Sequence, residues 1–175
     1  YVCPSAEEAS VPISVCPSGA ASHTLSPDES WMANRIYLLT CQVFVPAGRT
    51  LAIAAGTTIY ATPVGEGGVA PALVIEKGGM LIADGTAESP ITFTALNPEQ
   101  TSSSSVTTDT SSGSGTTVLE TRGKWGGLIL FGNAPTSAAT PKEIEGITGK
   151  TYGGSDPTDT SGILRYVRAW HGGAV

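Results

Sequence analysis

The sequence predicts an all-β fold, a right-handed parallel β-helix, because short strands recur along it at a regular spacing. Residues 43–60 contain three short apolar segments separated by Gly48 and Gly56. Residues 73–93 repeat this order, with Gly78 and Gly85 between the segments. An offset of about 30 residues is typical of repeat proteins, whose units bury a core only by stacking. Three strands joined by glycines that tolerate positive φ are what one coil of a β-helix requires.

Alternation within the segments predicts which side chains form the interior. Residues 125–133 and 162–168 supply a third and a fourth strand set. In residues 51–53 and 91–93 the outer two side chains are apolar and face inward, because successive strand residues point to opposite faces. The predicted interior residues are Val45, Leu51, Ile53, Ile59, Ile75, Leu81, Ile91, Phe93, Leu128, Leu130 and Leu164.

Two local signals compete with this interpretation. A β-sandwich is the alternative fold, but it needs hairpin turns, and Asp84-Gly85 is the only dipeptide of the Asn-Gly or Asp-Gly type. Residues 26–29 (SPDE) resemble a helix capping box with Pro at the first helical position. The sequence therefore predicts one helical turn near residues 27–33.

The expected domain organisation is an N-terminal extension over residues 1–22 and a β-helix domain over residues 23–175. Two long insertions interrupt the domain. Residues 101–117 contain 13 Ser or Thr in 17 positions and predict a solvated loop. Residues 134–161 are rich in Gly, Pro and Thr and predict a second, ordered loop.

Composition excludes several partners. The net charge is −6 and no cluster of Lys and Arg occurs, which argues against nucleic acid. No apolar run approaches the roughly 20 residues of a membrane span. The sequence begins at Tyr1 in place of an initiator Met, which suggests a processed or trimmed start.

Three cysteines occur, all in the first quarter of the chain. None forms a CxxC motif or has a His partner nearby, so a zinc site is not indicated. We expect a Cys16–Cys41 disulfide that ties the N-terminal segment to the first regular strand. A Cys3–Cys16 disulfide and three free thiols are the alternatives.

Four segments together resemble a family of secreted bacterial β-helix proteins. They are residues 42–61 (QVFVPAGRTLAIAAGTTIYA), 72–95 (ALVIEKGGMLIADGTAESPITFTA), 124–136 (KWGGLILFGNAPT) and 144–168 (IEGITGKTYGGSDPTDTSGILRYVR). The resemblance covers about residues 24–172. The family occurs widely in Bacteroidetes and marine bacteria, usually as surface proteins or lipoproteins without assigned activity. The resemblance implies a right-handed parallel β-helix at an extracellular location, and it carries no catalytic residue to transfer.

Candidate residues for chemistry are sparse. A polysaccharide hydrolase of β-helix fold needs clustered aspartates, whereas the five aspartates are dispersed and no strand segment holds two. A lyase needs a basic residue beside a calcium-bound carboxylate cluster, and Arg165 or Arg168 could supply only the basic group. Asp156 and Asp159 are weak calcium candidates, although their surroundings fit an ordinary turn better. We therefore expect a non-enzymatic protein without a cofactor.

Three functions remain in competition. The first is an extracellular structural subunit that polymerises head to tail, the second a carbohydrate-binding adhesin, and the third a polysaccharide-degrading enzyme. Open ends of a solenoid are templates for another chain, and the residues expected to mediate assembly are Val11, Ile13, Val15, Tyr166, Trp170 and Val175. No Asn-linked glycosylation sequon occurs. The expected O-glycan acceptors are Thr101, Ser102, Ser103, Thr107, Thr108 and Thr110.

Overall fold

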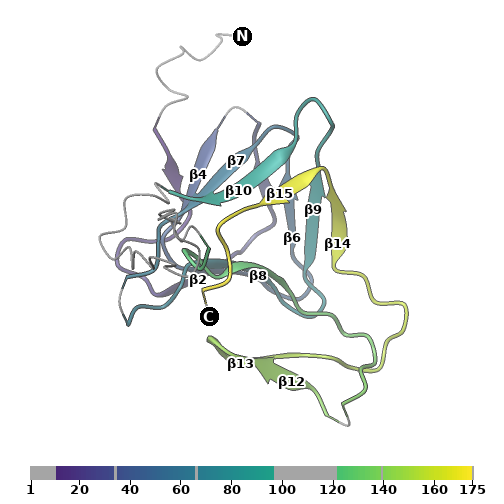
Figure 1. The fold of residues 1–175 in the computed structure, drawn as a ribbon. Coiled ribbons are helices and arrows are strands. Elements are labelled where there is room, and N and C mark those ends of the chain that lie inside the picture. The colour runs from purple at the N-terminus through teal and green to yellow at the C-terminus, as the bar shows by residue number, and fades with distance from the viewer. Residues whose placement is uncertain (1–10, 34, 66, 97–121, 139, 175) are drawn as a thin grey trace, which may run out of the picture.

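The computed structural model describes residues 11–33, 35–65, 67–96, 122–138 and 140–174, and these residues form a parallel β-helix. Three parallel sheets form its sides (Figure 1). Sheet A contains β1 (Ile13–Ser14), β4 (Ile36–Leu39), β7 (Thr58–Ala61), β10 (Ile91–Ala95) and β15 (Val167–Ala169). Sheet B contains β2 (Ser22–Thr24), β5 (Gln42–Val45), β8 (Ala72–Ile75) and β11 (Gly127–Leu130). Sheet C contains β3 (Glu29–Trp31), β6 (Thr50–Ile53), β9 (Met80–Asp84) and β14 (Gly162–Arg165).

Each coil takes one strand from each sheet, as the glycine-punctuated repeat predicts. The parallel registers stack equivalent residues, so that Tyr37, Ile59 and Phe93 follow one another in sheet A. Gly79 lies at one corner, where a Cβ atom would come within 2.4 Å of the Val45 carbonyl oxygen. The β-sandwich alternative is wrong, because every pair among these three sheets is parallel.

The stacked side chains form one continuous core, and the predicted interior is confirmed for the strands from β5 to β10. Val45, Leu51, Ile53, Ile59, Ile75, Leu81, Ile91 and Phe93 are buried. Leu128 is partly buried and packs against this core. Leu130 and Leu164 are in the predicted register, opposite Ile75 and Ala83, but they are 38% and 45% exposed. Their expected burial is wrong because no described strand lies above them.

The first coil begins earlier than the sequence indicates. Ile13–Ser14 pairs with β4 and Ser22–Thr24 pairs with β5, so the coil starts before the expected boundary at residue 23. The expected helical turn near residues 27–33 is also wrong. Glu29–Trp31 is a strand in register with Leu51–Ile53, and Asp28 accepts a hydrogen bond from the Thr50 amide, at 3.0 Å. Sheet pairing and the burial of Trp31 override the local capping signal.

The N-terminal end of the core is closed. Cys16, Leu25 and Trp31 face inward from the first coil and are buried. Trp31 stacks on Tyr37 with 4.8 Å between the ring centroids. The predicted Cys16–Cys41 disulfide is confirmed and joins the first coil to the second, with 6.0 Å between the Cα atoms.

The segment between β11 and β14 covers the outer face of sheet B. It contains an antiparallel hairpin of β12 (Lys142–Ile144) and β13 (Ile147–Tyr152), seen below β8 in Figure 1. Ile147 packs with Phe44, Val74 and Phe131 in a second apolar cluster. Lys150 Nζ lies 2.7 Å from Glu76 Oε1, and this ion pair joins the hairpin to the coils.

Some predictions lie outside the described residues. They are the solvated loop 101–117, Val175 and all six O-glycan acceptors, Thr101, Ser102, Ser103, Thr107, Thr108 and Thr110. The described part of the chain contains no helix with the length and hydropathy that a membrane span would need.

Candidate functional site

The C-terminal edge of the β-helix is open among the residues that the structure describes. Its strands are β11, β14 and β15, which we call the terminal rung, and no described strand pairs with their outer edges. The inward side chains of Leu130 and Leu164 are partly exposed here, in contrast with the closed N-terminal end. Two aromatic side chains flank β15, and Tyr166 is 60% and Trp170 is 51% exposed. The edge therefore combines unpaired backbone groups with uncovered apolar side chains.

The last strand of the terminal rung, β15, belongs to an incomplete coil. Sheet A has five strands, while sheets B and C have four each. After β15 the chain runs beside the earlier segment of residues 123–125. The Lys124 amide donates a hydrogen bond to the His171 carbonyl oxygen at 2.8 Å. The Ala174 amide then donates to the Trp125 carbonyl oxygen at 3.0 Å. The positions above β11 and β14 are thus open among the described residues, whereas β15 has already started the next coil.

Two residues with left-handed backbone conformation flank β15. Tyr166 has φ 48° and His171 has φ 63°, and they are the only non-glycine residues with positive φ in the described ranges. The His171 ring nitrogen Nδ1 lies 2.8 Å from the Thr94 hydroxyl. The Trp125 indole is buried, stacks on Phe93 and donates to the Trp170 carbonyl oxygen at 2.7 Å. Trp125 thus belongs to the interior, and its hydrogen bond holds the backbone of the exposed Trp170 in place.

The residues predicted to mediate assembly lie at the two ends of the described coils. Val11 and Ile13 are exposed at the N-terminal end, and Val15 packs partly against the core. Tyr166 and Trp170 are exposed beside the terminal rung. The structure therefore does not bring these two groups together within one chain.

One acidic and one basic side chain face each other across neighbouring coils. Arg165 is in register with Asp84, and Arg165 Nε donates to Asp84 Oδ1 at 2.6 Å while Nη2 donates to Oδ2. The hydrogen bonds from Arg165 lower the pKa of the Asp84 carboxyl and raise the pKa of the guanidinium. A carboxylate held ionised by a bidentate arginine is a poor proton donor. Sequence reasoning missed this pair because 81 residues separate its members.

The two weak calcium candidates are engaged in loop contacts. Asp156 Oδ1 accepts the Thr158 amide at 2.9 Å and the Thr158 hydroxyl at 2.7 Å. These hydrogen bonds lower the pKa of the Asp156 carboxyl. Asp159 Oδ2 accepts the Asn133 amide at 2.8 Å. Within the described ranges no three His, Cys, Asp or Glu side chains are grouped as metal ligands.

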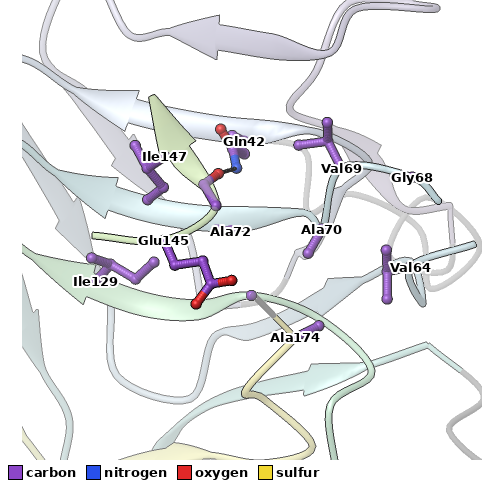
Figure 2. Close-up of a pocket in the computed structure, with 12 residues that line it drawn as sticks. Gln42, Val64, Gly68, Val69, Ala70, Ala72, Ile129, Glu145, Ile147 and Ala174 are labelled. Carbon is purple, nitrogen blue, oxygen red and sulfur yellow. Dashed lines mark hydrogen bonds between the residues drawn. The ribbon is translucent and has the colours of Figure 1, made fainter. Parts of the chain in front are cut away.

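A hollow of about 230 Å³ lies on the outer face of sheet B (Figure 2). Its floor is formed by the small residues Ala72 and Gly126, which lie next to the larger Ile129. The loop through Val69 forms one wall, and the hairpin tip at Glu145 forms the opposite wall. The hollow is thus mainly apolar, with polar groups at its rim.

Comparison with known families agrees with this architecture, although no curated protein and no solved structure matches the chain. The family described as the pectate-lyase-like β-helix domain matches residues 23–107 and 110–175. These segments span most of the chain and contain nearly all the described coils. The chain therefore belongs to the pectate-lyase-like β-helix domain family.

Proposed function

We propose that this chain is a non-enzymatic extracellular structural protein that assembles end to end through its terminal rung. The observation that carries the proposal is the difference between the two ends. Core residues of the first coil are buried, whereas Leu130 and Leu164 of the last complete coil are 38% and 45% exposed. A solenoid end with unpaired strands and uncovered core accepts further strands.

The proposed occupant is a second copy of the chain, and the strand registers specify how it joins. Ile13, Tyr37, Ile59, Phe93 and Ala169 follow one another across sheet A. One further step of this ladder pairs Ile13 of the second copy with Ala169 and joins β1 to β15. Because β15 already starts the next coil, this junction leaves one open strand position above β11 and one above β14. The large side chain of Ile13 and the small side chain of Ala169 then meet at a position that faces the core.

The same ladder places Val11 of the second copy opposite Val167. Val11 is exposed in the single chain, and Val167 is a partly buried residue packed against the core. Strand addition of this kind supplies backbone hydrogen bonds, while the alternate apolar side chains set the register. The contact joins different surfaces of two identical chains, so it produces a filament if the rotation does not close a ring.

The extracellular location is supported by the disulfide, because such bonds persist in oxidising compartments. The non-enzymatic role is supported by the dispersion of the aspartates, because a β-helix hydrolase needs clustered carboxylates, whereas Asp84 is paired with Arg165.

The test is electron microscopy and light scattering of the purified chain, with variants at the proposed junction. The unaltered protein is expected to form filaments, and Ile13→Asp is expected to abolish them because it places a charge in the joined core. Ala47→Asp, which changes an exposed side chain in the turn between β5 and β6, is the matched control and is expected to leave them intact. A chain that remains monomeric at high concentration would refute the proposal.

Glycan binding is a second candidate function, favoured by the exposed rings of Tyr166 and Trp170 beside Arg168. Aromatic rings present an apolar face to a sugar, and arginine donates hydrogen bonds to its oxygens. A glycan array probed with the protein and with Trp170→Ala tests it. Glycan binding that is lost in Trp170→Ala would support an adhesin. If the unaltered protein binds no glycan on the array, this candidate function is ruled out.

A further inference from the structure

We propose that the hollow on sheet B binds a small organic ammonium group, with Glu145 as its counter-ion. The inference stands apart from end-to-end assembly, because the hollow lies on a side of the β-helix. Its lining includes Val64, Ala72, Ile129 and Ile147 from the coils and the hairpin. Glu145 is the only charged side chain among the described residues that line it.

The walls of the hollow are held by hydrogen bonds, so the site exists before a ligand arrives. The Gln42 amide Nε2 donates to the Gly146 carbonyl oxygen at 2.9 Å and fixes the hairpin tip. The Val64 amide donates to the Lys124 carbonyl oxygen at 2.7 Å and fixes the facing loop. The Gly126 amide donates to the Pro71 carbonyl oxygen at 2.8 Å and fixes the floor. A preformed hollow avoids the ordering cost that a flexible loop would impose on binding.

Glycine at position 126 keeps the floor open. A Cβ atom there would come within 3.0 Å of the Ala72 side chain and 3.2 Å of the Pro71 carbonyl oxygen. Gly127 follows as the first residue of β11 and pairs with Ala72, which pairs in turn with Gln42 of β5. The side chains therefore shrink along this row, from Gln42 to Ala72 to Gly127, and leave space on the sheet surface.

Charge selects the ligand class. The Glu145 carboxylate is directed into the hollow on the side of Ala174 (Figure 2). No described residue forms an ion pair with it, and the whole chain carries a net charge of −6. An ammonium group would gain a charge-assisted hydrogen bond from this carboxylate. The apolar floor would at the same time cover the methylene groups or the ring C–H face of the ligand.

Two sources share this chemistry, an amino sugar and an aliphatic amine such as a lysine side chain. The ¹⁵N-labelled protein is titrated by NMR with glucosamine and, separately, with n-butylammonium. The ligand with the lower dissociation constant identifies the source. The amide signals of Gly126, Gly146 and Ala174 are expected to shift with at least one amine. Glucose, which is neutral and similar in size to glucosamine, is expected to leave them unchanged.

The variants test the role of the carboxylate. Glu145→Gln is expected to weaken binding about tenfold, the loss typical of a hydrogen bond to a charged group. Glu143→Gln removes the same charge from β12, outside the hollow, and is expected to retain binding. Added salt is expected to weaken binding to the unaltered protein, because the contact is partly exposed. Absence of amine-induced shifts, equal shifts with glucose, or unchanged affinity in Glu145→Gln would each overturn the proposal.

Discussion

Leu164 lies directly opposite Ala83 in the neighbouring coil, yet Leu164 is 45% exposed while Ala83 is fully buried. Both side chains face the same interior. The difference arises because β9 is covered by β14, whereas no described strand covers β14. Burial in a stacked fold thus depends on the next coil as well as on the pattern within a strand.

This difference predicts unequal effects of the same substitution at two positions of sheet C. Leu81→Ala is expected to lower the free energy of unfolding by about 3 kcal/mol, because it leaves a cavity in a fully buried site. Leu164→Ala removes the same atoms from a half-exposed site and is expected to cost less than about 1 kcal/mol. Urea unfolding at low protein concentration measures both values. Equal losses would show that Leu164 is covered in solution.

Much of the coil architecture was predictable from the sequence, because β5 to β10 combine alternating apolar residues with glycine corners. Residues 43–60 and 73–93 show this pattern clearly, and their strands stack in the expected register. The first coil was missed because β1, β2 and β3 contain only two or three residues each. Strands so short contain too few alternations to reveal a period.

The candidate sites were harder to predict because they join distant parts of the chain. Asp84 meets Arg165 across 81 residues, and Gln42 meets Gly146 across 104. The segment over 101–117 lies between the partners of both pairs, the segment over 134–161 contains Gly146, and both segments break the regular offset. The hollow itself follows from small residues at Ala72 and Gly126, which carry no chemical signal in a sequence.

The disulfide predicts a measurable loss on reduction. The Cys16→Ser/Cys41→Ser double variant is expected to lower the free energy of unfolding by about 3 kcal/mol, because the bond closes a chain segment of 25 residues and restricts the unfolded state. Chemical denaturation with and without reductant measures this loss. Cys3→Ser is the matched control and is expected to leave stability unchanged. A comparable loss in Cys3→Ser would show that a different thiol pairing prevails in solution.

Deletion of the Ser/Thr-rich segment is expected to leave the fold intact. Removal of residues 102–116 shortens a connection between coils at little entropic cost. The free energy of unfolding, measured by thermal denaturation, is expected to change by less than about 1 kcal/mol. A loss above about 2 kcal/mol would show that the segment is packed. Replacement of residues 142–152 by a Gly/Ser linker is the comparison of similar length. This change uncovers Phe44 and Val74 and is expected to destabilise the chain clearly.

The Asp84–Arg165 pair predicts a specific dependence on pH. Hydrogen bonds from Arg165 lower the pKa of Asp84 in the folded chain below the ordinary value that it has when unfolded. A group of this kind contributes stability above its unfolded pKa, and the contribution is lost as the pH falls through the folded pKa. Arg165→Gln is expected to raise the pKa of Asp84 toward the ordinary value and to reduce the acid sensitivity of unfolding.

Side-chain carboxyl titration by NMR from about pH 5 to pH 2 measures this shift directly. Asp156 is the internal control, because its pKa is lowered by the Thr158 hydroxyl and amide and not by an arginine. Its titration is expected to be the same in the unaltered protein and in Arg165→Gln. If Asp84 also titrates unchanged in that variant, the two side chains are separated in solution. Thr158→Ala provides the reciprocal result, since it is expected to raise the pKa of Asp156 and leave that of Asp84 unaltered, each carboxyl responding only to its own donor.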